Sequence, residues 1–297
     1  MSVSKIIVCS HKKDFTLQND IYMPLHVGKA CSSVDLGIQG DNTGDNISHK
    51  NPNYCELTGL YWAWKNLKGI DYIGLAHYRR YLDFTESVSS RVNIYTTTAE
   101  DIQKKLLNNR SGEEILGNYD IILPRPWYMS TSVGNMYIHS HIIEEYYILV
   151  RTILMLYPEY KESIERYWCK DNRWICFNMF FTKYNIFNDY CNWLFSILQE
   201  VEKRVRISDY AFQKRIFGFM SEIMLPLYCF HNDLNVKYMP VAMIGNNHIV
   251  PSFTKKIVQD IKSNLLFNLN KPIKSNYDIT GKSFDSCFIQ DNINFDK

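Results

Sequence analysis

Asp71-Tyr72-Ile73-Gly74-Leu75-Ala76-His77-Tyr78-Arg79-Arg80 is the stretch that decides the fold class. Its first six residues are predominantly apolar and predict a buried strand. A histidine, a tyrosine and two arginines follow directly, at the point where that strand ends. In an open α/β sheet, ligands bind outside the carboxyl ends of the strands. The stretch therefore predicts an anion-binding site at the edge of a buried sheet.

Strands and helices alternate on both sides of this stretch, which predicts an α/β fold with an open, mostly parallel sheet flanked by helices. A loop rich in Gly, Asp, Asn and Ser is expected over residues 35–53. We expect further strands at residues 5–10, 119–124 and 174–181, and helices at 51–67, 142–156, 187–204 and 209–228.

The composition is that of a globular protein without a nucleic-acid partner. Of the 297 residues, 46% are hydrophobic, enough to form a substantial core, and 33 basic side chains nearly balance 31 acidic ones. No apolar run is long enough for a membrane span or a signal peptide, so we expect a cytoplasmic protein. The eight cysteines form no C-x-x-C pair and are expected to be reduced core residues.

The sequence divides into a main domain, residues 1–245, and a basic amphipathic extension, residues 246–297. Five lysines and one acid between residues 254 and 274 give a local charge of 5 − 1 = +4. Ile257, Ile261 and Leu265 share one helical face. Such a helix either lies on anionic lipid or packs its apolar stripe against the main domain.

The ends of the predicted strands carry the candidate anion-binding groups. Ser10-His11-Lys12 follows the first strand, and His77-Tyr78-Arg79-Arg80 follows the strand over residues 71–76. Arginines offer forked donors that suit a diphosphate. The alternative is that Arg79 and Arg80 pair with surface carboxylates.

No motif for a metal, a cofactor or phosphoryl transfer is found. The chain contains no Asp-x-Asp, P-loop, G-x-G-x-x-G or G-x-S-x-G sequence. Its nearest two-carboxylate pattern, Glu200-Val201-Glu202, is expected on the exposed side of a helix. We therefore expect neither metal nor cofactor, and cationic side chains at the anion site instead.

Arg215, Gly218 and Glu222 are spaced by three and four residues, which places them on one helical face. Glu222 follows apolar residues, so a partly buried carboxylate with a raised pKa, suited to a general base, is predicted. The alternative is an internal ion pair between Arg215 and Glu222 that braces the helix.

Several segments together resemble the bacterial galactofuranosyltransferases first catalogued as a domain of unknown function in capsule, O-antigen and exopolysaccharide loci. The resemblance covers residues 5–245. Its most specific strings are E-L-T-G-L-Y-W-A-W-K-N at residues 56–66 and H-Y-R-R at 77–80. Other matching segments are residues 22–28, 45–48, 53–55, 73–76, 178–180 and 215–222.

The resemblance implies an inverting glycosyltransferase of GT-A-like fold that transfers galactofuranose from UDP-galactofuranose to a lipid-linked surface polysaccharide. It also implies peripheral contact with the cytoplasmic face of the inner membrane. The open alternatives are a transferase for another UDP-sugar and a non-catalytic carbohydrate-binding scaffold. The expected base is Glu222, followed by Glu56 and Asp209. The expected donor-binding residues are Ser10, His11, Lys12, Asp45, Asn46, Ser48, His77, Tyr78, Arg79, Arg80, Asn178 and Arg215.

Overall fold

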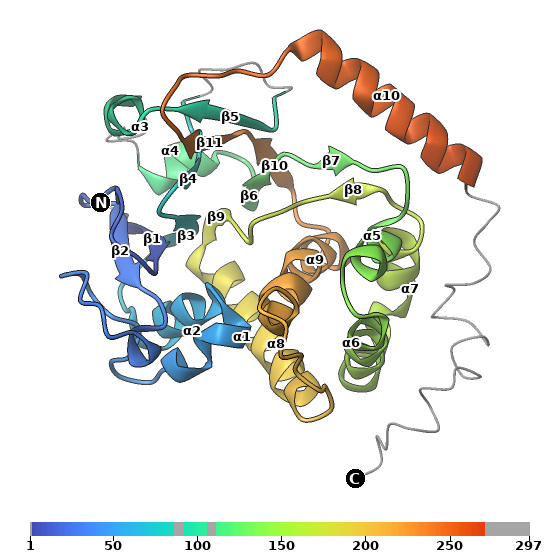
Figure 1. Cartoon of the computed structure of the whole chain (residues 1–297), viewed down its shortest axis with the longest axis horizontal. Coiled ribbons are helices and arrows are strands. Elements are labelled where there is room, and N and C mark those ends of the chain that lie inside the picture. Colours follow the sequence, from blue (N-terminus) through green and yellow to red (C-terminus); the bar gives the residue numbers. More distant parts are fainter. Residues whose placement is uncertain (1, 86–91, 106–110, 271–297) are drawn as a thin grey trace.

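The strand predicted at residues 71–76 forms as β3 (Tyr72–His77) and runs through the sheet (Figure 1). In the computed structural model, which describes residues 2–85, 92–105 and 111–270, this sheet has nine strands. A separate pair is formed by β7 (Trp127–Tyr128) and β8 (Arg173–Trp174). The other strands are β1 (Ser4–Ser10), β2 (Tyr22–His26), β4 (Arg80–Leu82), β5 (Ile94–Thr97), β6 (Ile121–Pro124), β9 (Phe180–Lys183), β10 (Val236–Met239) and β11 (Val241–Ile244).

The sheet combines parallel and antiparallel pairings. β3 pairs in parallel with β1, which in turn pairs in parallel with β2. On its other side, β9 runs antiparallel between β3 and β6. Phe180 pairs with Leu75, so β9 begins near the carboxyl end of β3. The α/β class is confirmed, and the sheet is more mixed than expected because the chain enters β9 from the edge where β3 ends.

Successive side chains of the strands point to opposite faces of the sheet and pack into two separate cores. Ile7 and Cys9 of β1 belong to the larger core, whereas Ile6 and Val8 belong to the smaller one. The larger core is covered by the main group of helices, and the smaller one by α3 and α4 (Figure 1). The helices are α1 (Asn51–Tyr54), α2 (Leu57–Asn66), α3 (Ala99–Lys105), α4 (Gly112–Leu116), α5 (Val133–Ser140), α6 (Ile143–Leu156), α7 (Lys161–Ser163), α8 (Tyr184–Glu202), α9 (Ile216–His231) and α10 (Phe253–Asn270).

Two of the predicted helices have different ends from those expected. The helix predicted over residues 51–67 is broken at Cys55, whose φ is 52°, and continues as α2. α9 begins at Ile216, so residues 209–215 precede it, and it continues through Pro226. There the indole nitrogen of Trp168 donates to the carbonyl oxygen of Ile223 at 3.1 Å. This hydrogen bond ties α9 to Trp168 in the turn next to Pro226, where the proline lacks a backbone donor.

The C-terminal extension is helical as α10, and most of its predicted apolar stripe does not pack against the main domain, although Ile257 is half-buried. α10 contacts β7, and Ile261 and Leu265 of the predicted apolar stripe are exposed rather than packed on the main domain. Lys271 and Lys274 lie outside the described residues. The division at residue 245 stays a prediction.

Two further expectations concern membrane spans and cysteines. None of the helices that the structure describes is long and apolar enough to cross a membrane. The seven cysteines within the described ranges are free thiols.

The packing of α2 on the sheet leads to a stability prediction. A Cβ added to Gly59 would lie 2.7 Å from Cγ1 of Val27 and 3.1 Å from Sγ of Cys9. Gly59→Ala should therefore lower the free energy of unfolding by about 1–2 kcal/mol, despite the better helix propensity of alanine. Chemical denaturation would measure this. Gly40→Ala is the control, because its Cβ would meet the exposed amide end of Asn42 and the partly exposed stem of Lys29, so its loss of stability should be smaller.

Candidate functional site

A cleft of about 800 Å³ opens where β1 and β3 end, at the edge predicted from the sequence. Its wall is completed by the start of α9 and by the end of β11, elements far apart along the chain. The side chains and backbone that line it belong to Cys9, His11, Val27, Asn51, Pro52, Cys55, Glu56, His77, Tyr78, Arg79, Arg80, Thr96, Phe177, Ala211, Lys214, Arg215, Glu222, Met243, Ile244 and Gly245.

Two consecutive residues have a positive φ, and the first of them, Phe177, lines the cleft. Phe177 has a φ of 79° and Asn178 a φ of 53°, directly before β9. This conformation is uncommon for residues other than glycine and costs free energy that the surrounding contacts must offset. The amide nitrogen of Asn178 donates to Oε1 of Glu56 at 2.7 Å and to the carbonyl oxygen of Gly218 at 3.1 Å. The strained pair thus ties β9 to both α2 and α9.

Two carboxylates, Glu56 and Glu222, face this cleft. Glu222 accepts a hydrogen bond from the backbone nitrogen of Phe177 at 3.3 Å. Burial, and then the nearby charge of Glu56, raise the pKa of Glu222 to about 7. The predicted raised pKa of Glu222 is thus present in the structure. A carboxyl group with this pKa can exchange a proton near neutral pH, as a general base requires.

Four permanent cations surround the carboxylates: Arg79, Arg80, Lys214 and Arg215. Arg79 donates to the carbonyl oxygen of Ile244 at 3.0 Å. Among the described residues, neither Arg79 nor Arg80 forms an ion pair with a carboxylate, so the alternative predicted for this pair is not seen. The cleft keeps a positive excess that suits an anionic ligand.

Aromatic rings lie against two of these cationic groups and against Lys12, which follows His11 outside the cleft lining. The guanidinium carbon of Arg80 lies 4.7 Å from the ring centre of Phe177, and that of Arg215 lies 5.2 Å from the ring centre of Phe219. Lys12 Nζ lies 5.6 Å from the ring centre of Tyr78. Contacts of this kind orient a cation without neutralising its charge.

The two histidines of the site have different environments. His77 makes a 2.7 Å hydrogen bond through Nε2 with the carbonyl oxygen of Phe177, so it also supports the strained segment. The pKa of His11 is lowered by burial and then by the positive charges of Lys12, Arg215 and His77. The neutral form of His11 is therefore favoured beside an electropositive cleft.

Gly218 allows close packing of α9 on the segment between α1 and α2. A Cβ at this position would lie 3.1 Å from Sγ of Cys55, so glycine lets α9 approach the break between α1 and α2. Arg215 donates through Nε to the same sulfur at 3.3 Å. Within the described part of the chain, no ion pair joins Arg215 to Glu222, so the predicted brace between them is absent.

Several predicted donor-binding residues do not line the cleft. Ser48 is buried, where its hydroxyl bonds to Asp41, and Oδ1 of Asp45 accepts from the hydroxyl of Tyr61 at 3.2 Å. Asn46 bonds to the carbonyl oxygen of Gly44 at 2.9 Å. The polar loop folds onto α2 and onto the buried carboxylate of Asp41, which holds these side chains within the loop.

Four further candidates are not among the residues that line the cleft: Lys12, Asn178, Ser10 and Asp209. Ser10, the last residue of β1, is buried. Asp209 is exposed in the segment before α9 instead of on the predicted helix. Placement therefore leaves Glu56 and Glu222 as the carboxylates positioned to act as base.

Lys214, Cys55 and the 243–245 segment line the cleft although the sequence did not single them out. Lys214 precedes Arg215, and these two adjacent basic residues resemble the pair Arg79 and Arg80. This pattern could have identified Lys214 as a site residue. Residues 243–245 arrive by the pairing of β11 with β4 and β5, which no local pattern reveals.

Comparisons with known proteins agree with this architecture. A solved structure described as the WbbM bifunctional glycosyltransferase in its apo form is similar to the chain, with a TM-score of 0.76 and 34% sequence identity. The match covers 83% of this chain but 46% of that one, so the chain spans about half the length of its structural relative. The expected GT-A-like α/β fold is thereby confirmed. No curated protein matches the chain.

A family model described as a domain of unknown function, DUF4422, matches residues 5–233. This segment includes β1, β3, the strained pair before β9 and α9, and with them most of the cleft. The chain belongs to the DUF4422 family.

Proposed function

We propose that the chain is an inverting glycosyltransferase that moves galactofuranose from UDP-galactofuranose to a lipid-linked surface polysaccharide, without a metal. One observation carries the proposal: a cleft with four permanent cations encloses a carboxyl group whose pKa is raised to about 7. The likeness to a bifunctional glycosyltransferase supports the reaction class. The choice of galactofuranose rests on the sequence resemblance.

The cations and the carboxylate of the cleft have separate roles in this reaction. Arg79, Arg80 and Arg215 bind the diphosphate and stabilise the negative charge that develops on it as the glycosidic bond breaks. Glu222 accepts the proton of the acceptor hydroxyl. The hydroxyl oxygen attacks the anomeric carbon on the side opposite the leaving UDP. One bond forms, one breaks, UDP leaves, and the configuration is inverted.

Glu56 and Asn178 are positioning residues, which affect the reaction through the pKa and the position of Glu222. The charge of Glu56 raises the pKa of Glu222, after the larger effect of burial, while the Asn178 amide fixes the position of Glu56. This arrangement keeps the base poised near neutral pH. Cytoplasmic UDP-sugar and a lipid-linked acceptor at the inner membrane are the partners that the proposal requires.

The proposal is tested by incubating the purified protein with a panel of UDP-sugars and a synthetic lipid-linked acceptor. Acceptor-dependent UDP release and a furanosyl product, with inversion seen by nuclear magnetic resonance, are expected with UDP-galactofuranose. If only another UDP-sugar supports turnover, that sugar nucleotide is the donor and the assignment of UDP-galactofuranose is wrong. Binding without UDP release would instead identify a non-catalytic carbohydrate-binding scaffold.

Removal of either strand-end arginine should weaken handling of the donor. Arg79→Ala and Arg80→Ala should each lower kcat/KM for the UDP-sugar by about 10- to 100-fold, because each removes a charge-assisted contact to the diphosphate. Arg166→Ala is the matched control, because Arg166 is an exposed arginine paired with Glu162 outside the cleft. Steady-state kinetics that show full activity in both site variants would rule out this diphosphate site.

Replacement of the proposed base should remove turnover while the fold remains. Glu222→Gln should lower kcat by about 100- to 10,000-fold, the usual contribution of general base catalysis. In the wild type, kcat should rise with pH through about 7, as Glu222 loses its proton. Glu56→Gln should keep turnover and shift this rise to lower pH, because the neighbouring negative charge is gone. Loss of turnover in Glu56→Gln alone would assign the base to Glu56.

Stability provides the control for the Glu222 variant. Because the folded protein raises the pKa of Glu222 above its unfolded value, ionisation of this group destabilises the fold as pH rises from about 4.5 to about 7. Glu222→Gln avoids this cost, so its unfolding free energy relative to the wild type should improve over that range. If Glu222→Gln instead loses more unfolding free energy relative to the wild type at pH 8 than at pH 5, the ionised Glu222 stabilises the fold and is a structural brace.

Transfer should survive chelation. The sequence has no Asp-x-Asp pair, and arginines occupy the position where a metal would neutralise the diphosphate. Activity in EDTA should therefore match activity in magnesium- or manganese-containing buffer. Activity lost in EDTA and restored by manganese would contradict the metal-free site.

A further inference from the structure

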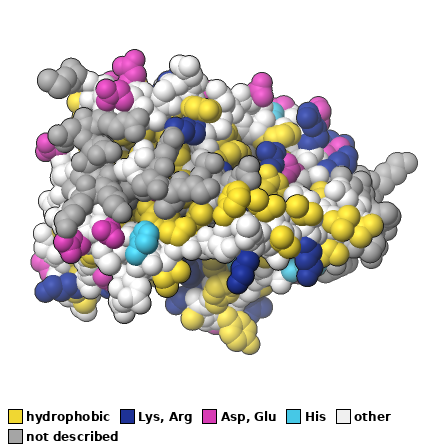
Figure 2. Space-filling view, turned by 90° about the horizontal axis from the view of Figure 1, so that it is seen from above, with side chains coloured by type: hydrophobic (Ala, Val, Ile, Leu, Met, Phe, Trp, Pro, Cys, Tyr) yellow, Lys and Arg dark blue, Asp and Glu magenta, His cyan; other side chains and the backbone are white. Residues whose placement is uncertain are grey.

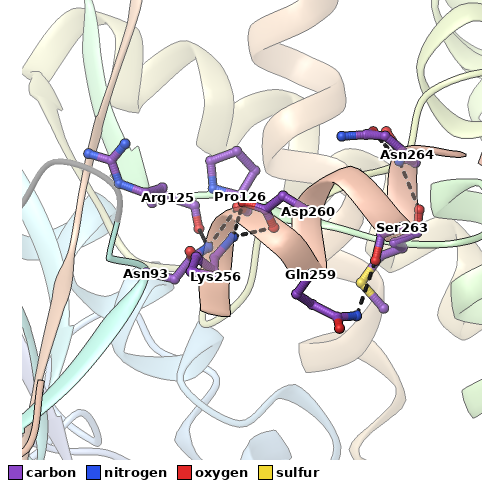
Figure 3. A network of polar contacts seen from close by, with 10 residues as sticks. Asn93, Arg125, Pro126, Lys256, Gln259, Asp260, Ser263 and Asn264 are labelled. Carbon is purple, nitrogen blue, oxygen red and sulfur yellow. Dashed lines mark hydrogen bonds and ion pairs between the residues drawn. The ribbon is translucent and has the colours of Figure 1, made fainter. Parts of the chain in front are cut away.

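α10 attaches to the rest of the protein through its polar side (Figure 3). Lys256 pairs with Asp260 on this side, and its Nζ lies 5.6 Å from the ring centre of Trp127 in β7. Ser263 is buried, and Asn264 accepts a hydrogen bond from Asn172 at 2.9 Å. Lys256 and Asn264 therefore connect the inner side of the helix to β7 and to the segment before β8.

The opposite side of α10 carries an aliphatic stripe, residues 258, 261, 265 and 269. Val258 is 66% exposed, Ile261 62%, Leu265 58% and Leu269 63%. The spacings of three and four residues place these side chains on one helical face. In Figure 2, which views the molecule from above, hydrophobic side chains gather on the side where α10 lies in Figure 1. A contiguous exposed apolar surface of this kind marks an interaction site.

Two lysines flank the stripe. Lys255 and Lys262 are exposed and seven residues apart, so they lie on one side of the helix beside Val258 and Leu265. The acid of α10, Asp260, lies on the inner side in its pair with Lys256. The outer face thus combines aliphatic side chains with positive charge, and no acid balances it within the described helix.

We propose that this outer face of α10 docks on the surface of an anionic lipid bilayer. Leu, Ile and Val side chains enter the boundary between headgroups and acyl chains, while the long stems of Lys255 and Lys262 let their charges reach lipid phosphates. α10 follows β11, whose end lines the cleft, so docking would hold the cleft at the membrane. This deepens the proposed function, which requires a lipid-linked acceptor.

Charge separates the bilayer from the two other possible occupants. A second copy that docks by the same face would bring lysines against lysines, which opposes association. Residues 271–297 contain four lysines and four aspartates, so they offer no excess of negative charge to complement the face. An anionic lipid surface satisfies both the apolar stripe and the lysines.

The test is co-flotation of the full chain with vesicles and needs no substrate, so its outcome is independent of the transfer reaction. The wild type should float with vesicles of phosphatidylcholine and phosphatidylglycerol at low salt, and much less with phosphatidylcholine alone or at high salt. Ile261→Ser with Leu265→Ser should abolish flotation. Lys255→Gln with Lys262→Gln should weaken it about 30-fold, the equivalent of roughly 1 kcal/mol for each lysine.

Matched controls lie elsewhere on the surface. Met155→Ser with Leu156→Ser changes an exposed apolar pair at the end of α6, and Lys161→Gln with Lys170→Gln changes two exposed lysines. Both control variants should float like the wild type. The proposal is overturned if the wild type does not bind the anionic vesicles, or if the stripe variant binds them equally well. A stripe-dependent dimer without vesicle binding, seen by light scattering, would also overturn it.

Discussion

The side-chain amide of Asn178 is the contact on which the site depends. It joins Glu56, at the start of α2, to the carbonyl oxygen of Gly218 in α9, while its own backbone leads into β9. A buried amide donor of this kind stabilises mainly through the cost of leaving it unpaired. That cost opposes relaxation of the left-handed backbone at Phe177 and Asn178. Three elements from distant parts of the chain are thereby fixed around one cleft.

The electrostatics of the cleft follow from this arrangement. Enclosed by protein, Glu222 is easier to protonate than a free glutamate, and the adjacent Glu56 adds to the effect. Arg80 and Arg215 oppose it, since their charges favour the ionised form. The resulting pKa near 7 is a balance between burial and charge, which an anionic ligand would alter by partly neutralising the arginines. Ligand binding and the proton affinity of Glu222 are therefore coupled.

Local sequence patterns predicted the parts of the fold that depend on local physics. The apolar run of β3 and the basic residues after it were placed correctly, because a strand end determines where its next residues lie. The spacing of Arg215 and Glu222 brought both to the cleft, since three- and four-residue steps share a helical face. The long loop was expected from its composition, but its side chains turned inward to the buried Asp41. Composition cannot show which way a loop folds.

Features that arise from tertiary contacts could not be read from the sequence. The positive φ of Cys55 interrupts a continuous helical pattern at the point where Gly218 of α9 approaches the chain closely. The orientation of α10 also could not be predicted from its sequence. Its periodicity identified an aliphatic face, and burial would ordinarily direct that face inward. The contact of Lys256 with the ring of Trp127, the hydrogen bond between Asn264 and Asn172, and the burial of Ser263 fix the polar face on the protein instead. The aliphatic face is therefore left for whatever lies outside the molecule.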